Sequence, residues 1–411
     1  KTVQSRNYVE NLEHLIQMYL LVFIKKKLIS VDTILPVVLE LKTRSPRLKV
    51  IIIAPDQKTF DEISKNKTLK LCIEKNFKLI QLGGLSNFFF TGLLQRTQWL
   101  LKLLFIFLLL TLNKAKVIHF GSLEEWPRRL VTFTNRGKIV LFESNGWGTG
   151  EFEDQIDALN TQHIRLPITT FKSSGALVGF SSNWRFRSIP EAGHLNVFSV
   201  RPSKLWPAWQ MFLNKNASQQ WEEECKRICL DKNKKVFLFI LGTLDALPSL
   251  DMGCGPIDDL VVDTLDAMYL ASPNATVLMK PHPITNIARL EGIIKRAKSN
   301  DIHITYLHPG VVAHYSFAAI CNYYSTSLID LWYSNVPTIE YTKYREEGLR
   351  LTGGGSMRPE FVDHFIEIGK TDELGKILTK CAHKKPSKIP LNKRNNPLDT
   401  NDSKVVDFLL S

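Results

Sequence analysis

Short apolar runs alternate with longer stretches of helical periodicity along most of the chain. In the first half the runs are rich in β-branched residues, and they occupy residues 49–54, 77–82, 117–120 and 138–142. Runs that are apolar at consecutive positions, with helical lengths between them, are typical of parallel strands covered on both faces. This half of the chain is therefore predicted to form a parallel sheet.

The same alternation starts again in the second half. Apolar runs occupy residues 235–241, 276–279, 302–306, 319–322 and 338–341, with helix-like stretches at 257–270 and 286–299 among them. Because strands that alternate with helices build parallel sheets, the simplest arrangement is two doubly wound sheets. The predicted fold class is α/β, with two such domains.

Breaks in the pattern divide the chain into three parts. Residues 1–220 are predicted to form an N-terminal, acceptor-side domain, which ends in a segment, residues 180–220, that carries several Trp and Arg residues and lacks a clean period. This segment is interpreted as an interdomain connection or as acceptor-side loops. Residues 221–383 form the predicted C-terminal domain. Residues 384–411 form a tail that is expected to be mobile or packed on the surface, because most of it is polar and bears Pro.

One segment, residues 99–112, is apolar enough to raise the question of a membrane. It is interrupted by Lys102 and flanked by Arg96, Lys114 and Lys116. A run this short does not span a bilayer comfortably. Two alternatives stay open: a helix buried in the core, and an interfacial helix whose basic rim meets anionic lipid headgroups.

Composition and charge narrow the class of protein. With 411 residues, 44% hydrophobic and 23% charged, the chain has the composition of a globular protein of two domains. Its net charge of +13 implies an acidic partner, such as a sugar phosphate, an anionic glycan, a membrane surface or nucleic acid. The basic residues are dispersed and no nucleic-acid-reading motif is present, so no nucleic acid is expected.

The cysteines and the start of the chain indicate a reducing compartment. The six cysteines are scattered, and only Cys225 and Cys229 lie close in sequence, on a predicted helix, so neither a disulfide framework nor a zinc pattern emerges. The sequence begins at Lys1 without the features of a secretory signal. We expect a cytoplasmic protein, attached peripherally to the inner face of the cytoplasmic membrane if the segment at 99–112 is interfacial.

Two polar segments stand at predicted strand and helix ends in the second half. Lys280-Pro281-His282-Pro283 follows the run at 276–279, and Ser325-Thr326-Ser327 opens a helix-like stretch. A cation and an imidazole at a strand end, with hydroxyl and N–H groups at a helix start, make a candidate phosphate clamp. Each segment alone has a structural use, as a rigid strand exit or as an ordinary N-cap. Their order within one predicted sheet favours a nucleotide site.

The stretches VLMKPHP and ITYLHPGVVAHYSFAAICNYYSTSLIDLWYSNVPTIEY resemble a known family. They are similar to the C-terminal half of bacterial capsule-polysaccharide and lipopolysaccharide glycosyltransferases, particularly the retaining Kdo transferases that use CMP-Kdo. The likeness covers residues 235–345 and is looser elsewhere. It implies a GT-B fold, in which two Rossmann-like domains face each other across a cleft. It also implies a nucleotide-sugar donor and an acceptor of the kind used in O-antigen biosynthesis.

The resemblance assigns a donor site residue by residue. Its members are Lys280, His282, Pro283, Ser325, Thr326, Ser327 and Glu340. His282 matches the histidine that contacts the CMP phosphate, the three hydroxyl residues match a motif that grips the same phosphate, and Glu340 is expected to face the ribose. A CMP-sugar has one phosphate, which Lys280, His282 and helix N–H groups can neutralise without a metal. We therefore expect no cofactor and no metal.

Catalysis needs carboxylates at the anomeric carbon and at the acceptor hydroxyl. The resemblance implies a glycosyl-enzyme adduct on an Asp after the first strand of the C-terminal domain, for which Asp245 is the candidate and Asp251 the reserve. Glu143 follows the run at 138–142 in a Gly-rich loop and is the candidate base for the acceptor hydroxyl. Its alternative role is a local cap or ion pair.

The sequence is interpreted as a metal-independent glycosyltransferase that moves Kdo, or a related 2-keto sugar acid, from a CMP-sugar to a bacterial surface glycan or lipid-linked glycan. Two alternatives stay open. Transferases of polyol phosphates, which use CDP-glycerol or CDP-ribitol, also combine a histidine with a serine-rich C-terminal motif. A basic, non-enzymatic protein that binds polyanions would also account for the charge.

Overall fold

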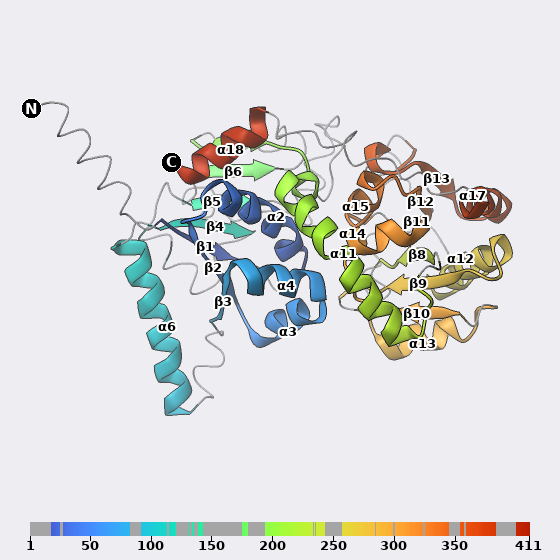
Figure 1. Ribbon diagram of the computed structural model, residues 1–411, viewed down its shortest axis with the longest axis horizontal. Coiled ribbons are helices and arrows are strands. Elements are labelled where there is room, and N and C mark those ends of the chain that lie inside the picture. Colours follow the sequence, from blue (N-terminus) through green and yellow to red (C-terminus); the bar gives the residue numbers. More distant parts are fainter. Residues whose placement is uncertain are drawn as a thin grey trace, which may run out of the picture.

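Two parallel β-sheets form the framework of the chain, and helices pack against both (Figure 1). The structure is a computed structural model. It describes residues 18–24, 28–82, 92–112, 115–120, 131, 134, 139–142, 175–179, 194–232, 234, 236–242, 257–283, 285–298, 301–323, 325–344, 354–356, 359–383 and 400–411.

The first sheet has seven strands in the order β3-β2-β1-β4-β5-β6-β7, and all neighbouring strands run parallel. Their bounds are β1 (Tyr19–Phe23), β2 (Lys49–Ala54), β3 (Lys78–Gln81), β4 (Lys116–Phe120), β5 (Ile139–Phe142), β6 (Ala176–Gly179) and β7 (Asn196–Ser199). The strand order reverses at β1, as it does in doubly wound sheets.

The second sheet has six parallel strands in the order β10-β9-β8-β11-β12-β13 and reverses at β8. Their bounds are β8 (Val236–Ile240), β9 (Thr276–Lys280), β10 (Ile302–Ile304), β11 (Ser316–Cys321), β12 (Thr338–Thr342) and β13 (His364–Glu367). The predicted α/β fold class with two doubly wound sheets is therefore confirmed.

Helices of the first domain cover both faces of its sheet. They are α2 (Leu28–Arg44), α3 (Gln57–Lys65), α4 (Lys67–Asn76) and α6 (Leu93–Thr111), followed after β7 by the 3-10 turn η2 (Ser203–Leu205) and the long helix α11 (Pro207–Ile228). The second domain contains α12 (Ile257–Ala271), α13 (Ile287–Ile294), α14 (Pro309–Val312), η4 (Ala313–Tyr315), α15 (Leu328–Tyr333), η5 (Pro359–Phe361) and α17 (Thr371–His383). Helix α18 (Thr400–Leu410) ends the chain.

Successive residues of the first sheet point to opposite faces, and each face has its own core. Leu20 and Val22 of β1 belong to the large core with α2 and α11, whereas Leu21 and Phe23 belong to a smaller core with α6. The two-residue period of a strand produces this division. Because both faces are covered, every residue of such a strand is apolar, which is the pattern that the sequence displays.

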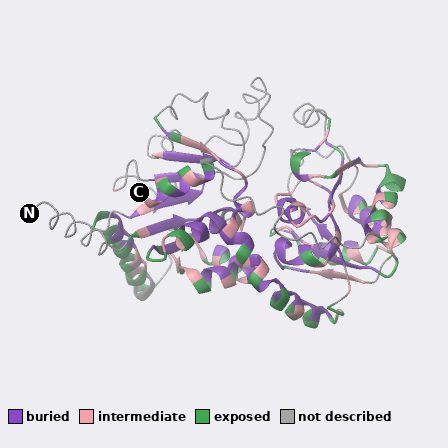
Figure 2. Ribbon diagram, turned by 45° about the horizontal axis from the view of Figure 1, so that its top comes forward, coloured by how far each residue is buried: buried purple, intermediate pink, exposed green. Residues whose placement is uncertain are grey.

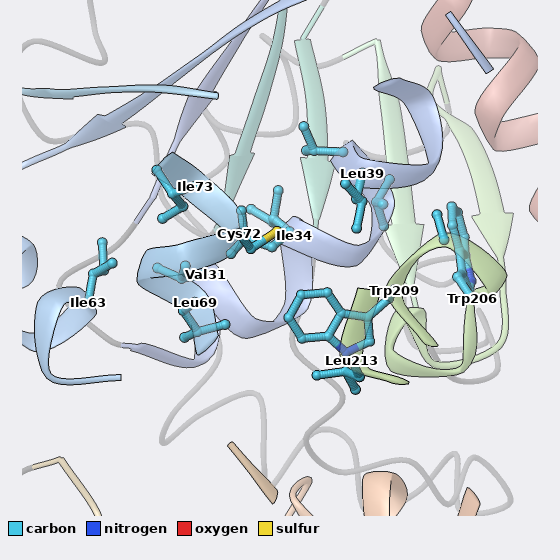
Figure 3. Packing of buried hydrophobic residues seen from close by; sticks show 14 of the residues in the cluster. Val31, Ile34, Leu39, Ile63, Leu69, Cys72, Ile73, Trp206, Trp209 and Leu213 are labelled. Carbon is cyan, nitrogen blue, oxygen red and sulfur yellow. The ribbon is translucent and has the colours of Figure 1, made fainter. Parts of the chain in front are cut away.

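The large core joins helices that are far apart in the sequence. Figure 3 shows Val31 and Ile34 of α2 beside Leu69 of α4, with Trp209 and Leu213 of α11 directed into the same packing. All five side chains are almost completely buried. Burial of large apolar side chains of this kind stabilises the fold by roughly 1.5–3 kcal/mol each.

Helix α11 belongs to both domains. It packs on α2 and α4 of the first domain and on α14 of the second. Trp221, within this helix, stacks on Tyr315 with ring centroids 4.3 Å apart. The helix predicted around Cys225 is confirmed, and the predicted domain boundary between residues 220 and 221 lies inside it.

The chain returns to the first domain at its C-terminal end. Helix α18 packs on α2 and β7, with Val405 and Val406 fully buried (Figure 1). Asp402, also buried, forms a 2.7 Å ion pair with Arg201, which follows β7. Residues 400–411 of the predicted tail are therefore packed, while residues 384–399 lie outside the described part of the chain.

The apolar segment at 99–112 lies largely within α6. None of the helices in the described part of the chain has the length and apolar character that crossing a bilayer requires. One stripe of α6, including Leu103, Ile106 and Leu110, is buried against the first sheet, whereas other large apolar residues of the helix are exposed. One face of this segment is therefore core and another faces outward, while its use as an interfacial helix stays a prediction.

Candidate functional site

Strand β9 delivers Lys280 to the carboxyl edge of the second sheet. The following residues turn sharply, because the Thr285 N–H donates a 2.9 Å hydrogen bond to the His282 carbonyl. Lys280 and His282 are half-buried, and Pro283 is exposed. Ligands of open α/β sheets bind beyond this edge, so the segment lies where a ligand site is expected.

The hydroxyl residues Ser325, Thr326 and Ser327 lie between β11 and α15, and all three are half-buried. Ser325 Oγ accepts a 3.3 Å hydrogen bond from the Ser327 N–H, and the Ser325 carbonyl accepts one of 2.9 Å from the Leu328 N–H. Ser325 therefore supports the start of α15 locally. Its use as a phosphate ligand stays a prediction.

The two segments share one edge of one sheet. Strands β9 and β11 are separated by β8 alone, so their ends lie two strand spacings apart, or roughly 10 Å. Lys280 also interacts electrostatically with Asp330 of α15. The predicted juxtaposition of these segments at the same end of the second sheet is present.

A buried cluster of charges lies beside Lys280 and joins the two domains. Lys204 of η2 places its Nζ 2.5 Å from Asp32 Oδ2 of α2 and 2.9 Å from Asp330 Oδ2. His308, which precedes α14, donates from Nε2 to Asp32 Oδ1 across 2.9 Å, because its Nδ1 accepts the Gly310 N–H. We call Asp32, Lys204, His308 and Asp330 the interdomain charge cluster.

The ionisation of the cluster is set by pairing rather than by burial. Burial alone would raise the pKa of Asp32, but Lys204 and His308 outweigh it and hold that pKa well below its ordinary range. Burial would likewise lower the pKa of Lys204, yet Asp32 and Asp330 raise it above its ordinary value. Lys204 and Asp32 are therefore charged in the folded protein at neutral pH.

Lys280 has a different electrostatic environment. Burial lowers the pKa of its amine to about 8, and Lys204 adds to this effect, while Asp32 and Asp330 oppose it. No described residue forms an ion pair or a hydrogen bond with this amine. A cation at a strand end without a close counter-ion is suited to bind an anion.

The end of β8 approaches the same edge. A Cβ at Gly242 would lie 3.2 Å from Cβ of Tyr323, which follows β11, so a larger residue there would push against the backbone side of the tyrosine. Tyr323 in turn meets Tyr344 edge-on, with ring centroids 5.7 Å apart. Aromatic rings thus border the edge at which the donor is predicted to bind.

Glu340 lies within β12 rather than at its end. Its side chain is fully buried, and the Tyr344 hydroxyl donates a hydrogen bond to its carboxylate. Burial raises the pKa of the Tyr323 hydroxyl, and the carboxylate of Glu340 raises it further. The predicted contact of Glu340 with a ribose stays a prediction.

The three candidate catalytic carboxylates, Glu143, Asp245 and Asp251, lie outside the described residues. The described strands that lead to them end at Phe142 in β5 and at Ile240 in β8. Their roles stay predictions.

In the part of the chain that the structure describes, no group of three or more His, Cys, Asp or Glu side chains is arranged to hold a metal ion. Two histidines of this part of the chain have carboxylate partners: His303 lies 2.9 Å from Asp301, and His308 lies the same distance from Asp32.

The interdomain charge cluster was missed at the level of sequence. Its residues come from four separate segments, and only His308 and Asp330 fall within the stretch that resembles a known family. A signal did exist, because Asp32 and Lys204 are single charges within apolar or uncharged surroundings that become core. A charge in such a position needs a partner, but the sequence does not say which.

Comparisons with known proteins show which fold the chain has. No protein-family model matches the chain. No curated protein matches it. Solved structures do: UDP-GlcNAc 2-epimerase from Methanocaldococcus jannaschii has 16% identity and a TM-score of 0.52, over 96% of this chain and 99% of that chain. The enzyme from Neisseria meningitidis, bound to UDP-GlcNAc, has 14% identity and a TM-score of 0.53, with the same coverage.

A third structure, putative UDP-N-acetylglucosamine 2-epimerase from Listeria monocytogenes, has 12% identity and a TM-score of 0.54, over 95% of each chain. Since these likenesses extend over nearly the whole of each chain, they show a GT-B-like fold of two Rossmann-like sheets. The fold implied by the resemblance to glycosyltransferases is therefore confirmed. No specific family is shown.

Proposed function

We propose that the chain is a glycosyltransferase that binds the phosphate of a nucleotide sugar at the carboxyl edge of the second sheet. The observation that carries the proposal is the placement of Lys280, a strand-end cation with no ion-pair partner among the described residues, on the same edge as Ser325–Ser327. The donor phosphate would receive hydrogen bonds from the Lys280 amine, from His282 and from the serine-threonine segment.

The donor proposed is CMP-Kdo or a CMP-sugar of a related 2-keto acid, and the resemblance of residues 235–345 supports this choice. A single phosphate carries less charge than a diphosphate, and one lysine, one imidazole and backbone N–H groups suit it without a metal. The acceptor proposed is a surface glycan or a lipid-linked glycan on the cytoplasmic side of the membrane.

The chemistry proposed is a double displacement. A carboxylate oxygen of Asp245, or of Asp251, attacks the anomeric carbon while the bond from that carbon to the phosphate oxygen breaks, and the bonding electrons leave with CMP. An acceptor hydroxyl then displaces the carboxylate, and Glu143 takes the hydroxyl proton. The two steps together retain the anomeric configuration.

A second candidate is a nucleotide-sugar epimerase. The three solved structures named above, which are UDP-GlcNAc 2-epimerases, one of them putative, have TM-scores above 0.5 and cover this chain almost completely. The fold accommodates both reactions, and fold alone does not choose between them. An epimerase would convert the sugar while it remains attached to the nucleotide.

One assay separates these candidates. The purified chain is incubated separately with CMP-Kdo, CDP-glycerol and UDP-GlcNAc, with and without a lipopolysaccharide or capsule acceptor, and the products are resolved by mass spectrometry and NMR. The proposal predicts CMP release from CMP-Kdo and a glycosylated acceptor. A glycerol phosphate adduct would favour the polyol-phosphate alternative, and an epimerised UDP-sugar would favour the epimerase.

The Asp245→Asn variant tests the proposed adduct in the same assay. It should still bind the donor nucleotide, because the phosphate contacts are untouched, but transfer should fall by orders of magnitude because the nucleophile is lost. If transfer remains at the wild-type rate, Asp245 is not the nucleophile, and the same measurement on Asp251→Asn decides whether the adduct mechanism survives.

A further inference from the structure

Helix α6 is apolar on the face that the first sheet covers and also on the face that the sheet leaves open. Leu103, Ile106 and Leu110 form a helical stripe against the sheet, with exposed fractions of 9%, 2% and 2%. Their spacing of three and four residues is that of one helix face. This stripe accounts for the anchoring of α6.

A second stripe runs along the opposite face. Leu101, Phe105, Leu108 and Leu112 repeat at the same spacing, and their exposed fractions are 60%, 38%, 41% and 73%. At 100° per residue this stripe lies almost diametrically opposite the buried one. Three more large apolar residues border it and are also exposed, namely Leu100, Leu104 and Phe107. We call these seven residues the outer face of α6.

An exposed face of this kind is unusual for a protein that stays alone in water. A helix that is apolar all round is ordinarily buried, and contiguous exposed apolar patches mark surfaces that meet a partner or a membrane. The outer face therefore predicts an apolar partner. Its charge surroundings indicate which one.

The sequence on both sides of α6 carries one sign of charge. Between Glu74 and Glu124 the sequence has six basic residues and no acidic residue. Lys78 lies with its amine 5.4 Å from the ring centroid of Phe105, so a cation borders the outer face directly. Lys102 reaches back and donates a 2.8 Å hydrogen bond to the Gln81 carbonyl, which leaves the outer face free of its charge.

We propose that the outer face of α6 docks on an anionic lipid surface, with its leucine and phenylalanine side chains in the interfacial layer and the neighbouring lysines at the headgroups. Apolar burial combined with cationic flanks is the chemistry of interfacial helices. The helix lies along the membrane plane, since its opposite face is occupied by the protein core.

The position of α6 is compatible with a working cleft. Figures 1 and 2 show α6 at the side of the first domain that is remote from the second domain, with exposed residues along its length. The interdomain charge cluster lies where the first domain contacts the second, and Lys280 belongs to the second domain. Docking through α6 would therefore leave the edge of the second sheet accessible. The inference does not depend on the identity of the donor nucleotide.

Vesicle co-sedimentation of the full chain tests the proposal. Wild-type protein is mixed with vesicles of phosphatidylcholine alone or of phosphatidylcholine with phosphatidylglycerol, at low and high salt, without nucleotide. We expect binding to the anionic vesicles that weakens at high salt. The double variant Leu101→Glu/Leu112→Glu should bind at least about tenfold more weakly, because two apolar side chains are lost from the contact.

A matched control exists on the same chain. Met211 and Leu270 are 70% and 66% exposed and lie on other elements, so Met211→Glu/Leu270→Glu introduces the same charge change at similar exposure. It should bind vesicles nearly as well as the wild type, apart from the effect of two added charges. Circular dichroism of both variants establishes that they are folded.

Three results would overturn the proposal. Wild-type protein could fail to bind anionic vesicles, or the α6 variant could bind them as well as the control variant does. Alternatively, sedimentation could show a wild-type dimer that the α6 variant alone converts to a monomer, which would identify the outer face as a contact between two copies. Failure of the nucleotide-sugar proposal would leave all of these measurements unchanged.

Discussion

Lys204 contacts both domains. Its ammonium group lies between a carboxylate of the first domain, Asp32, and one of the second, Asp330, and its side chain is 1% exposed. Each of the three charges is costly to bury alone and acceptable only as part of the group. The group therefore behaves as a unit.

Replacing Lys204 by Met should destabilise the protein by about 3–5 kcal/mol, because two buried carboxylates lose their shared cation. Lys298→Met is a matched control: this lysine is 58% exposed and its ion pair with Asp266 spans 3.5 Å, so its loss should cost less than about 1 kcal/mol. Urea denaturation at neutral pH measures both. Equal midpoints for the two variants would show that the cluster does not stabilise the folded state.

The same cluster predicts a loss of stability in acid. The folded-state pKa of Asp32 is held far below the ordinary value of 3.8, so its stabilising contribution is present above that value and is lost as the pH falls below it. Lys204→Met removes the main attractive charge, and its stability should depend less steeply on pH in this range. An unchanged slope would contradict the pairing.

Lys280 leads to a second prediction of pH dependence. Ligand binding should weaken as the pH rises, whereas the stability given by the cluster is lost as the pH falls. Its amine has a pKa of about 8, so it is protonated below that pH and loses its charge above it. A nucleoside monophosphate already carries its second charge above a pKa of about 6. CMP affinity should therefore fall as the pH rises through about 8.

Lys280→Met should abolish this pH dependence and weaken CMP binding by about tenfold or more, the value of a charge-assisted hydrogen bond. Lys370→Met changes an exposed lysine of the same domain and should leave both unchanged. Fluorescence or calorimetric titrations at several pH values measure the two variants. A wild-type affinity that stays constant through pH 8 would remove Lys280 from the phosphate site.

Part of this site could be predicted from the sequence, and the rest could not. Lys280, His282 and Ser325 could be placed together because each follows a strand of one predicted sheet, and parallel strands bring their ends to one edge. The contacts of Lys204 with Asp330 and of Asp32 with His308 could not, because they depend on how two domains pack. No local period or spacing encodes that packing.

Among the elements, most of the strands buried on both faces were predicted from the sequence, although the buried strand β6 was missed. Strand β2 has the predicted bounds, β9 differs from prediction by one residue at one end, and β8 differs by one residue at each end. Strand β7 was missed because it lies at a sheet edge, where it is half-buried and its residues NVFS are partly polar. Strand β13, HFIE, lies at the edge of the second sheet and was missed for the same reason.

Other omissions have a different cause. Strand β1 is fully apolar but stands within a longer apolar stretch, so its limits were hidden. Helix α18 follows a polar segment and shows its apolar residues only near the chain end. Its packing against the first domain is a long-range contact, which the neighbouring sequence does not predict.

Helix α18 should stabilise the first domain measurably. Leu409 is 4% exposed and belongs to the large core, so Leu409→Ala should cost about 2–5 kcal/mol of unfolding free energy through lost burial and a cavity. Asp407→Ala alters an exposed residue of the same helix and should change stability by less than about 0.5 kcal/mol. Thermal denaturation compares them. If Leu409→Ala unfolds at the same temperature as the wild type, the C-terminal helix is not part of the core.

At the scale of the whole molecule, two parallel sheets bring their edges toward one shared region. The charge cluster joins α2 of the first domain to the segments that follow β10 and β11 of the second, and α11 extends along both domains. Ligand sites of doubly wound domains lie at such edges. The apolar runs of the sequence form these two sheets, and the two sheets together place a candidate site between the domains.

The central claim is that a nucleotide phosphate binds at the carboxyl edge of the second sheet. Isothermal titration of the purified chain with CMP, UMP and GMP, each with and without a metal chelator, tests it most directly. We expect micromolar binding of CMP that the chelator does not affect, weaker binding of UMP and GMP, and loss of affinity in His282→Ala with the fold intact. Absence of nucleotide binding, or unchanged CMP affinity in a folded His282→Ala protein, would contradict it.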